Sequence, residues 1–130
     1  MGGTPTSKSA NCLGLTRQLH FSQRDRGLSL DITLSLNGIP IAALELKNPL
    51  TGQTVEQAKQ QYRTDRDPRE AIFAFKCRTL AHFAVDTEEV WMTTRLAGEA
   101  THFLPFNTGS GDGAGNPPDP HGRTYRTAYL

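Results

Sequence analysis

The sequence lacks any long apolar segment and any apolar leader. No run of apolar residues approaches the roughly 20 that a membrane helix needs. The first ten residues are small and polar, without the apolar stretch of a secretory signal. We therefore expect a cytoplasmic protein with no membrane partner.

Paired cysteines and clustered histidines are also missing. Cys12 and Cys77 stand alone, and the four histidines are scattered without metal-ligand spacing. A zinc knuckle needs cysteine or histidine pairs a few residues apart, and a disulfide framework needs more cysteines. Both classes are excluded.

An excess of charge is absent as well. The 130 residues carry 14 Lys and Arg against 13 Asp and Glu, for a net charge of +1. This balance excludes a protein that coats DNA through its whole surface, but it permits a local basic groove. The length suits one domain with a modest core.

Composition divides the chain into three parts. We expect a flexible lead-in over residues 1–10, a folded domain over 11–106, and a Gly/Pro-rich loop with the start of a missing continuation over 107–130. The glycines of the last part resemble a phosphate loop only superficially, because no Gly-Lys-Ser/Thr follows them.

Hydrophobic periodicity predicts strands before and after a helical segment. Alternating residues from Leu28 to Leu36 indicate a strand with one buried face, and Asn37-Gly38 indicates a hairpin turn. Thr54 and Gln57 fit a capping box at the start of a helix. The expected elements are strands at 14–21, 28–36, 39–47, 79–85 and 89–95, a helix from 54, a short helix after Asp67-Pro68, and an extended piece at 101–106. This order predicts an α/β or α+β domain with a mixed sheet flanked by helices.

Three charged residues lie in the predicted hairpin: Asp31, Glu45 and Lys47. A two-residue turn would pair Leu36 with Ile39 and put Glu45 on the opposite face from Asp31. A three-residue turn with a bulge would pair Leu36 with Pro40 and place Asp31 opposite Glu45, about 5 Å apart at Cβ. Because the first register puts two charges among leucines, the cost of burial favours the second.

Two facing carboxylates select a hard cation such as Mg²⁺, which can polarise a phosphodiester and lower the pKa of bound water. Lys47, on the same face, could orient the attacking water. The competing interpretation of Asp31, Glu45 and Lys47 is a surface salt-bridge cluster that contributes little. The pattern alone leaves both readings open.

Longer motifs around these residues resemble a known family. The runs Gln18–Phe21, Asp31–Pro40 (with Asn-Gly-Ile-Pro at its end) and Glu45–Pro49 (Glu-Leu-Lys-Asn-Pro) are similar to the N-terminal nuclease domain of the R subunit of type I restriction enzymes. Segments 56–63 and 65–68 extend the resemblance. That domain belongs to the PD-(D/E)xK nuclease superfamily, and the match covers roughly residues 11–106.

The resemblance implies roles for individual residues. Asp31, Glu45 and the backbone carbonyl of Leu46 would bind Mg²⁺, and Lys47 would be the catalytic lysine. The family also has a Q-x-x-x-Y motif on the next helix, from which this sequence departs because Tyr62 follows Gln61 directly. We carry over Gln61 as a catalytic-site residue, although Gln61 and Tyr62 can equally be ordinary helix residues.

Four basic residues are candidates for contacts with DNA phosphates: Arg17, Lys59, Arg63 and Arg66. The alternation of arginines with acidic residues near Asp65 also suits a solvated helix face.

The resemblance implies Mg²⁺-dependent endonuclease activity on double-stranded DNA, with methyltransferase (M) and specificity (S) subunits as partners. ATP would enter only through motor domains that this chain lacks, and the chain would be a truncated R subunit. The alternatives are an inactive fragment that binds DNA or another subunit, and a different PD-(D/E)xK nuclease.

Overall fold

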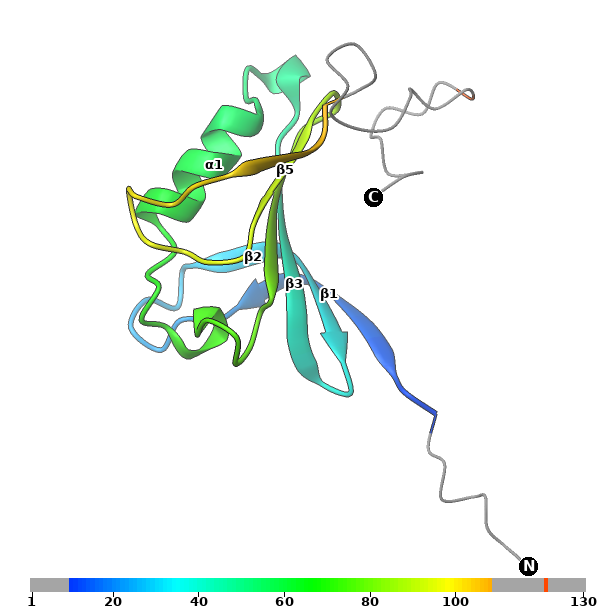
Figure 1. The fold of residues 1–130 in the computed structure, drawn as a ribbon, viewed down its shortest axis with the longest axis vertical. Helices are drawn as coiled ribbons and strands as arrows, with labels where there is room; N and C mark the ends of the chain where they lie inside the picture. Colours follow the sequence, from blue (N-terminus) through cyan, green and yellow to red (C-terminus); the bar gives the residue numbers. More distant parts are fainter. Residues whose placement is uncertain (1–9, 109–120, 122–130) are drawn as a thin grey trace, which may run out of the picture.

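A computed structural model describes residues 10–108 and residue 121 (Figure 1). The predictions for residues 1–9 and for most of the segment 107–130 lie outside these residues. The elements are β1 (Leu13–His20), β2 (Ser29–Leu36), β3 (Ile39–Leu46), the 3-10 helix η2 (Pro49–Thr51), α1 (Val55–Thr64), the 3-10 helix η3 (Ala71–Phe73), β4 (Ala81–Val85), β5 (Val90–Thr93) and β6 (Leu104–Asn107).

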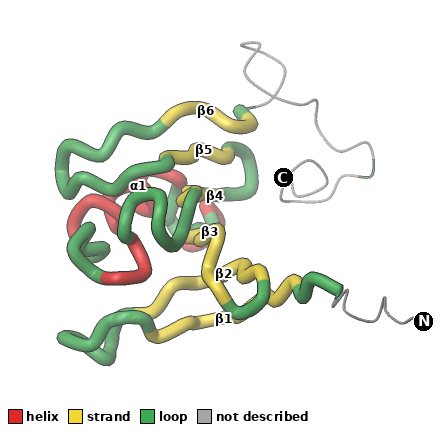
Figure 2. Tube along the Cα trace, turned by 60° about the horizontal axis from the view of Figure 1, so that its bottom comes forward, coloured by secondary structure: helices red, strands yellow, loops and turns green. Residues whose placement is uncertain are grey.

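The six strands form one mixed sheet in sequence order (Figure 2). β3 and β4 are parallel, and the other neighbours are antiparallel. Parallel neighbours need a crossover connection, which α1 supplies as it packs over β3 and β4. The predicted mixed α/β sheet is confirmed.

Helix α1 begins where the sequence predicts. Thr54 is its N-cap, and the reciprocal bonds of a capping box join Thr54 and Gln57. The expected second helix is only the three-residue turn η3, whose N-cap Glu70 makes no capping bond. Within the described residues one α-helix, α1, therefore covers the sheet, and the second predicted helix is a single short 3-10 helix. None of the described helices is long and apolar enough to cross a membrane.

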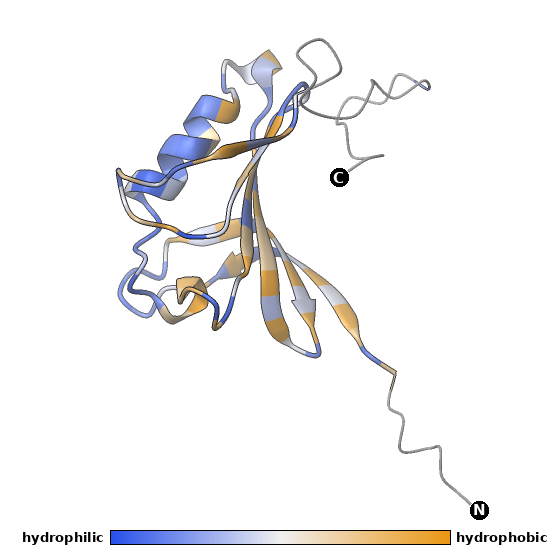
Figure 3. Cartoon of the chain, in the orientation of Figure 1, coloured by the Kyte–Doolittle hydropathy of each residue, from blue (hydrophilic) through white to orange (hydrophobic). Residues whose placement is uncertain are grey.

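Apolar side chains alternate with polar ones along the strands (Figure 3) and divide into two clusters. On the side of α1 the core contains Leu30, Ala43, Val55, Ala58, Tyr62, Phe73, Ala84, Leu96 and Phe103. A second cluster joins Leu44, Val85 and Val90 with the partly buried Ile32, Leu46 and Phe83. The alternation within β3 thus puts Ala43 and Glu45 toward α1, and Leu44 and Leu46 away from it.

The β2–β3 hairpin corrects the predicted turn. Leu36 pairs with Ile39 across the two-residue turn, where Asn37 has φ 53° and Gly38 has φ 81°. The predicted pairing of Leu36 with Pro40 is wrong. The extra residue is Ile41, because Ser35 pairs with Pro40 and Leu34 pairs with Ala42.

The predicted consequence for the carboxylates nevertheless holds. Beyond the bulge Ile32 pairs with Leu44, and the next residues along the two strands are Asp31 and Glu45. A two-residue turn by itself would put Asp31 and Glu45 on opposite faces of the sheet. The bulge shifts the register by one residue and so moves Glu45 to the face of Asp31.

Candidate active site

Asp31 and Glu45 meet on the face of the sheet that α1 covers. The backbone N–H of Leu46 donates to Oδ2 of Asp31 at 2.9 Å, which ties the two strands together at this point. Glu45 comes one residue before the end of β3, where the chain leaves the sheet to form the crossover. Such a crossover from the carboxyl end of a parallel strand is a common position for ligand sites.

Glu45 is fully buried and paired with Arg66. Nε and Nη2 of Arg66 donate to the same oxygen, Oε1 of Glu45, at 2.8 and 2.6 Å. The side chains are 0% and 1% exposed. The alternative of a surface salt-bridge cluster of Asp31, Glu45 and Lys47 is wrong, because Glu45 is buried and its ion-pair partner is Arg66.

The second oxygen of Glu45, Oε2, is buried and has no hydrogen-bond donor. Burial raises the pKa of Glu45 to about 7, against the opposing effect of Arg66, and the negative charge of Asp31 raises it further. A buried acceptor beside a second carboxylate calls for a proton or a cation. This is the feature that makes the pair a candidate metal site.

Asp31 is fixed from its other side by Gln18. Nε2 of Gln18 donates to Oδ1 of Asp31 at 3.1 Å, and Oε1 of Gln18 accepts from the hydroxyl of Ser29 at 2.9 Å. Gln18 adopts φ 52°, unlike its strand neighbours. Gln18 is not among the site residues predicted from the sequence, although it stands within one of the motifs that carry the family resemblance. Its place in that motif is the signal in the sequence, and its register opposite Asp31 is visible only in the structure.

Lys47 follows β3 and lines a groove with residues of α1. The other lining residues are Gln53, Gln57, Gln60, Gln61, Thr64 and Asp65. The structure therefore brings Lys47 and Gln61 into one hollow, and Glu45 lies two residues before Lys47, near the end of β3. The glutamines give this groove neutral donors and acceptors rather than a strong charge.

Tyr62 belongs to the core. Its side chain is 0% exposed, and its hydroxyl lies 3.1 Å from the carbonyl of Ala43 and 3.0 Å from that of Phe83. Since these carbonyls belong to β3 and β4, Tyr62 anchors α1 across the parallel pair. Of the two neighbouring residues, Gln61 faces the groove and Tyr62 holds the helix in place.

Two of the four predicted phosphate contacts are buried. Arg66 is 2% exposed and engaged with Glu45. Lys59 is 7% exposed, pairs with Glu56 at 2.8 Å and lies 3.6 Å from the ring centre of Trp91. Burial and these contacts leave Lys59 and Arg66 poorly placed for the predicted contact with DNA phosphates.

Arg63 and Arg17 are more accessible than Lys59 and Arg66, but neither is well placed to contact DNA beside Asp31 and Glu45. The half-buried Arg63 donates to the carbonyl of Thr101 through Nε and Nη2, both at 3.3 Å. Arg17 is exposed, yet it pairs with Ile32, whose side chain belongs to the cluster away from α1. Cross-strand partners share a face, so Arg17 lies on the opposite side of the sheet from Asp31.

The carboxylate oxygens at this site are the type of ligand that a hard divalent cation prefers. Asp31 and Glu45 supply carboxylate oxygens, and the unsatisfied Oε2 of Glu45 is an available ligand. Among residues 10–108 and 121, no group of three or more His, Cys, Asp or Glu side chains could hold a metal. A metal here would therefore need further oxygen ligands from the backbone, as predicted for Leu46, from water or from substrate.

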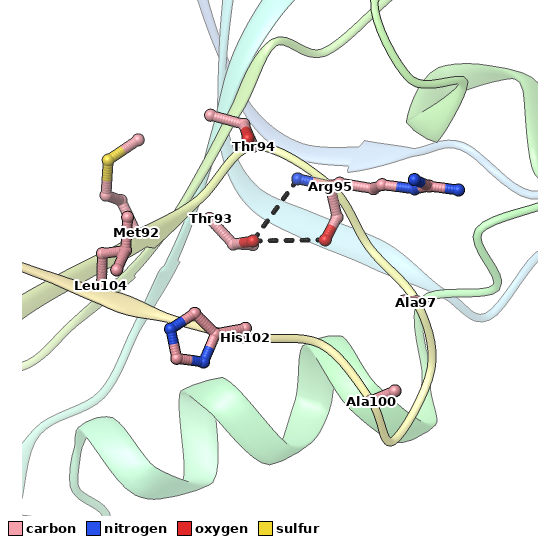
Figure 4. Close-up of a pocket in the computed structure, with 8 residues that line it drawn as sticks. All are labelled: Met92, Thr93, Thr94, Arg95, Ala97, Ala100, His102 and Leu104. Carbon is pink, nitrogen blue, oxygen red and sulfur yellow. Dashed lines mark hydrogen bonds between the residues drawn. The ribbon is translucent and has the colours of Figure 1, made fainter.

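A separate hollow lies between β5 and the segment leading into β6 (Figure 4). Its lining residues are Met92, Thr93, Thr94, Arg95, Ala97, Ala100, His102 and Leu104. The Thr93 hydroxyl accepts from the N–H of Arg95 at 3.4 Å and donates to its carbonyl at 3.2 Å. No predicted site residue lines this hollow, and it contains no carboxylate.

Comparisons with known proteins give one family. The family model described as type I restriction enzyme R protein N terminus matches residues 5–101. No curated protein and no solved structure matches the chain. The matched residues are well over half of the 130 and include β1 to β5, with Asp31, Glu45 and Lys47. The chain belongs to the family of type I restriction enzyme R protein N termini, whose α/β restriction-endonuclease-like fold it adopts.

Proposed function

We propose that this domain hydrolyses phosphodiester bonds of double-stranded DNA with Mg²⁺, as the nuclease part of a type I restriction R protein. The observation that carries the proposal is the buried Oε2 of Glu45, which has no donor and lies beside Asp31. Membership of the R protein N-terminus family supports a role in a type I restriction enzyme. The M and S subunits, and ATP hydrolysis by motor domains, belong to the complete enzyme in this proposal.

The residues divide the chemistry among them. Asp31, Glu45 and the carbonyl of Leu46 would hold Mg²⁺, which supplies charge for the phosphate and activates water. Gln18 and the N–H of Leu46 keep Asp31 in place. Lys47, which lines the groove with Gln61, would orient the attacking water and offset charge on the phosphate.

The second candidate is a module that binds DNA or another subunit without cutting. The observation that favours it is the Arg66–Glu45 pair, because a guanidinium neutralises one of the two carboxylates. A metal at this site would face a smaller negative charge than two free carboxylates offer. The two candidates differ in whether the triad of Asp31, Glu45 and Lys47 produces cleavage.

A plasmid assay distinguishes them. Supercoiled DNA with Mg²⁺ is incubated with the wild-type chain, Glu45→Gln and Lys47→Ala, and with the controls Glu99→Gln and Lys76→Ala, which alter exposed residues of the same types. We expect each triad variant to lose about 10²-fold or more of the nicking rate, while the controls cut like the wild type and EDTA stops cleavage. Equal cutting by all five proteins would contradict the assignment. Absence of cutting by all folded proteins would favour the binding module.

A further inference from the structure

Arg66 engages Glu45 in an unusual way. Both of its donating nitrogens contact Oε1, so this oxygen is fully occupied while Oε2 receives no donor. An arginine that merely balanced charge could bridge both oxygens of the carboxylate, as side-by-side pairs do. Here the guanidinium donates to one carboxylate oxygen of Glu45 and leaves the other oxygen without a donor.

The guanidinium is itself held by three further contacts. Nη2 donates to the carbonyl of Ser29 at 2.8 Å, and Nη1 donates to the carbonyl of Asp65 at 3.3 Å. The guanidinium carbon lies 5.3 Å from the ring centre of Phe21. Ser29 begins β2, two residues before Asp31, and Asp65 is the C-cap of α1. Arg66 therefore connects the strand of Asp31, the strand of Glu45 and the end of α1.

Asp31 is also held by donors from other elements, but with one donor on each oxygen. Its Oδ1 accepts from Gln18 and its Oδ2 from the N–H of Leu46. Each carboxylate of the pair is thus oriented by a partner on a different element. Residues that orient metal ligands in this way commonly change metal affinity by 10- to 100-fold when they are replaced.

We infer that Arg66 is a positioning residue that anchors Oε1 of Glu45 and presents Oε2 as a ligand for the divalent cation. The inference rests on the proposed function, since it concerns the same metal site. It replaces the earlier expectation that Arg66 contacts DNA. It also gives a reason for a buried arginine in an acidic site. The positive charge of Arg66 by itself would weaken the binding of a cation, so its contribution would lie in the geometry of the ligand.

Binding of Mn²⁺, a probe that takes the same oxygen ligands as Mg²⁺, tests the inference without cleavage. Calorimetric titrations compare the wild-type chain with Arg66→Lys, Glu45→Gln and Arg69→Lys. Lysine keeps the positive charge but cannot donate two fixed N–H bonds to one oxygen. Arg69 is the matched control, because it also contacts a carboxylate, that of Asp67, through Nε and Nη2, but on the surface.

We expect Arg66→Lys to weaken Mn²⁺ binding about tenfold or more, Glu45→Gln to abolish it, and Arg69→Lys to leave it unchanged. If Arg66→Lys binds like the wild type, or more tightly, the role of Arg66 is wrong while the metal site stands. If the wild type binds no Mn²⁺, the metal site of the proposed function fails, and the role of Arg66 fails with it.

A measurement on the wild type decides the question even if Arg66→Lys does not fold. In ¹⁵N-labelled protein, we expect the buried Nε–H of Arg66 to give a slowly exchanging resonance while it is bonded to Glu45. We expect this resonance to persist at saturating Mg²⁺. Its loss on addition of Mg²⁺ would show that Arg66 releases Glu45 when the metal binds, and would overturn the inference.

Discussion

At the scale of single residues, burial of the Arg66–Glu45 pair costs free energy of folding, and this cost calls for a functional explanation. Removing two charges from water costs several kcal/mol, and their attraction often only offsets this loss. The raised pKa of Glu45 shows that desolvation outweighs the favourable effect of Arg66 at this position. A pair of apolar residues could fill the same space, so stability alone does not account for this pair.

Breaking the pair from one side leaves a buried charge without a partner. We expect Arg66→Ala to lower the free energy of unfolding by about 3–5 kcal/mol, as measured by urea denaturation. The control Arg69→Ala removes an arginine that is 76% exposed from its pair with Asp67 and is expected to change little. Equal effects of the two substitutions would contradict the buried state of the Arg66–Glu45 pair.

His82 is a second buried titratable group. It is 1% exposed, its ring lies 5.7 Å from the rings of both Tyr62 and Phe73, and its Nδ1 has no hydrogen-bond partner. Burial lowers the pKa of His82 from 6.5 to about 4. The ring is therefore neutral in the folded protein at neutral pH.

The lowered pKa predicts a loss of stability in acid. Between about pH 4 and 6.5 the unfolded chain binds a proton at His82 that the folded chain does not, so the free energy of unfolding falls as the pH falls through this range. We expect His82→Leu to remove this contribution, so that the variant loses less stability than the wild type between pH 7 and pH 5. Denaturant titrations at both pH values measure this difference, and identical losses would contradict it.

At the scale of elements, Asp86 joins α1 to the strands. Its Oδ2 accepts from the N–H of Val55 in the first turn of α1, and its Oδ1 accepts from the N–H groups of Glu88 and Glu89, all at 2.8 to 2.9 Å. In the sequence, Asp86 stands only in the connection between the strands predicted at 79–85 and 89–95. One carboxylate thus fixes both the β4–β5 turn and the start of the helix that lines the groove.

Loss of Asp86 should loosen α1 from its N-terminal end. Asp86→Ala leaves the buried N–H of Val55 without an acceptor, which costs about 1–3 kcal/mol. We expect faster amide hydrogen exchange in the first turn of α1 and in the β4–β5 turn. The comparison is Thr54→Ala, which removes only the exposed cap and should leave the β4–β5 turn protected. Unchanged exchange in Asp86→Ala would contradict this role.

At the scale of the whole molecule, the near-zero net charge limits how the domain can hold DNA. Lys59 and Arg66 are buried, and Arg17 lies on the face away from the carboxylates. Lys47 and the half-buried Arg63 are the candidates that remain on the side of α1. Under the proposed function, these few residues could supply only a small part of the binding to DNA.

This charge distribution predicts a weak dependence of DNA binding on salt. With about two phosphate contacts, the plot of log K against log salt concentration should have a slope of roughly −2, and Lys47→Gln should reduce its magnitude by about 1. Fluorescence anisotropy with a labelled duplex measures both slopes, with Arg69→Gln as the control. A slope of about −5 or steeper would reveal phosphate contacts that these residues do not provide.

Much of the architecture could be predicted from the sequence because its signals are local. Alternation from Leu28 to Leu36, the Asn37-Gly38 turn and the Thr54–Gln57 capping box each depend on residues close together in the chain, and the structure contains the strand, the turn and the cap. The predicted buried face of the strand is only partly present, because Thr33 is 0% exposed and Leu34 is 37% exposed. The short helix after Pro68 was overestimated, since η3 spans only three residues and receives no side-chain cap. The bulge at Ile41 was assigned to the wrong residue because no local signal distinguishes it from a longer turn.

The sequence by itself determined the succession of elements along the chain, the helix start, the three charged residues and the family. Only the tertiary structure decided which partners those charges have. Glu45 and Arg66 are 21 positions apart, Asp31 and Gln18 are 13 apart, and Asp86 and Val55 are 31 apart. Burial depends on the sum of all elements packed around a side chain, so a pattern along one strand cannot show that Glu45 is enclosed or that Arg66, rather than Lys47, neutralises it.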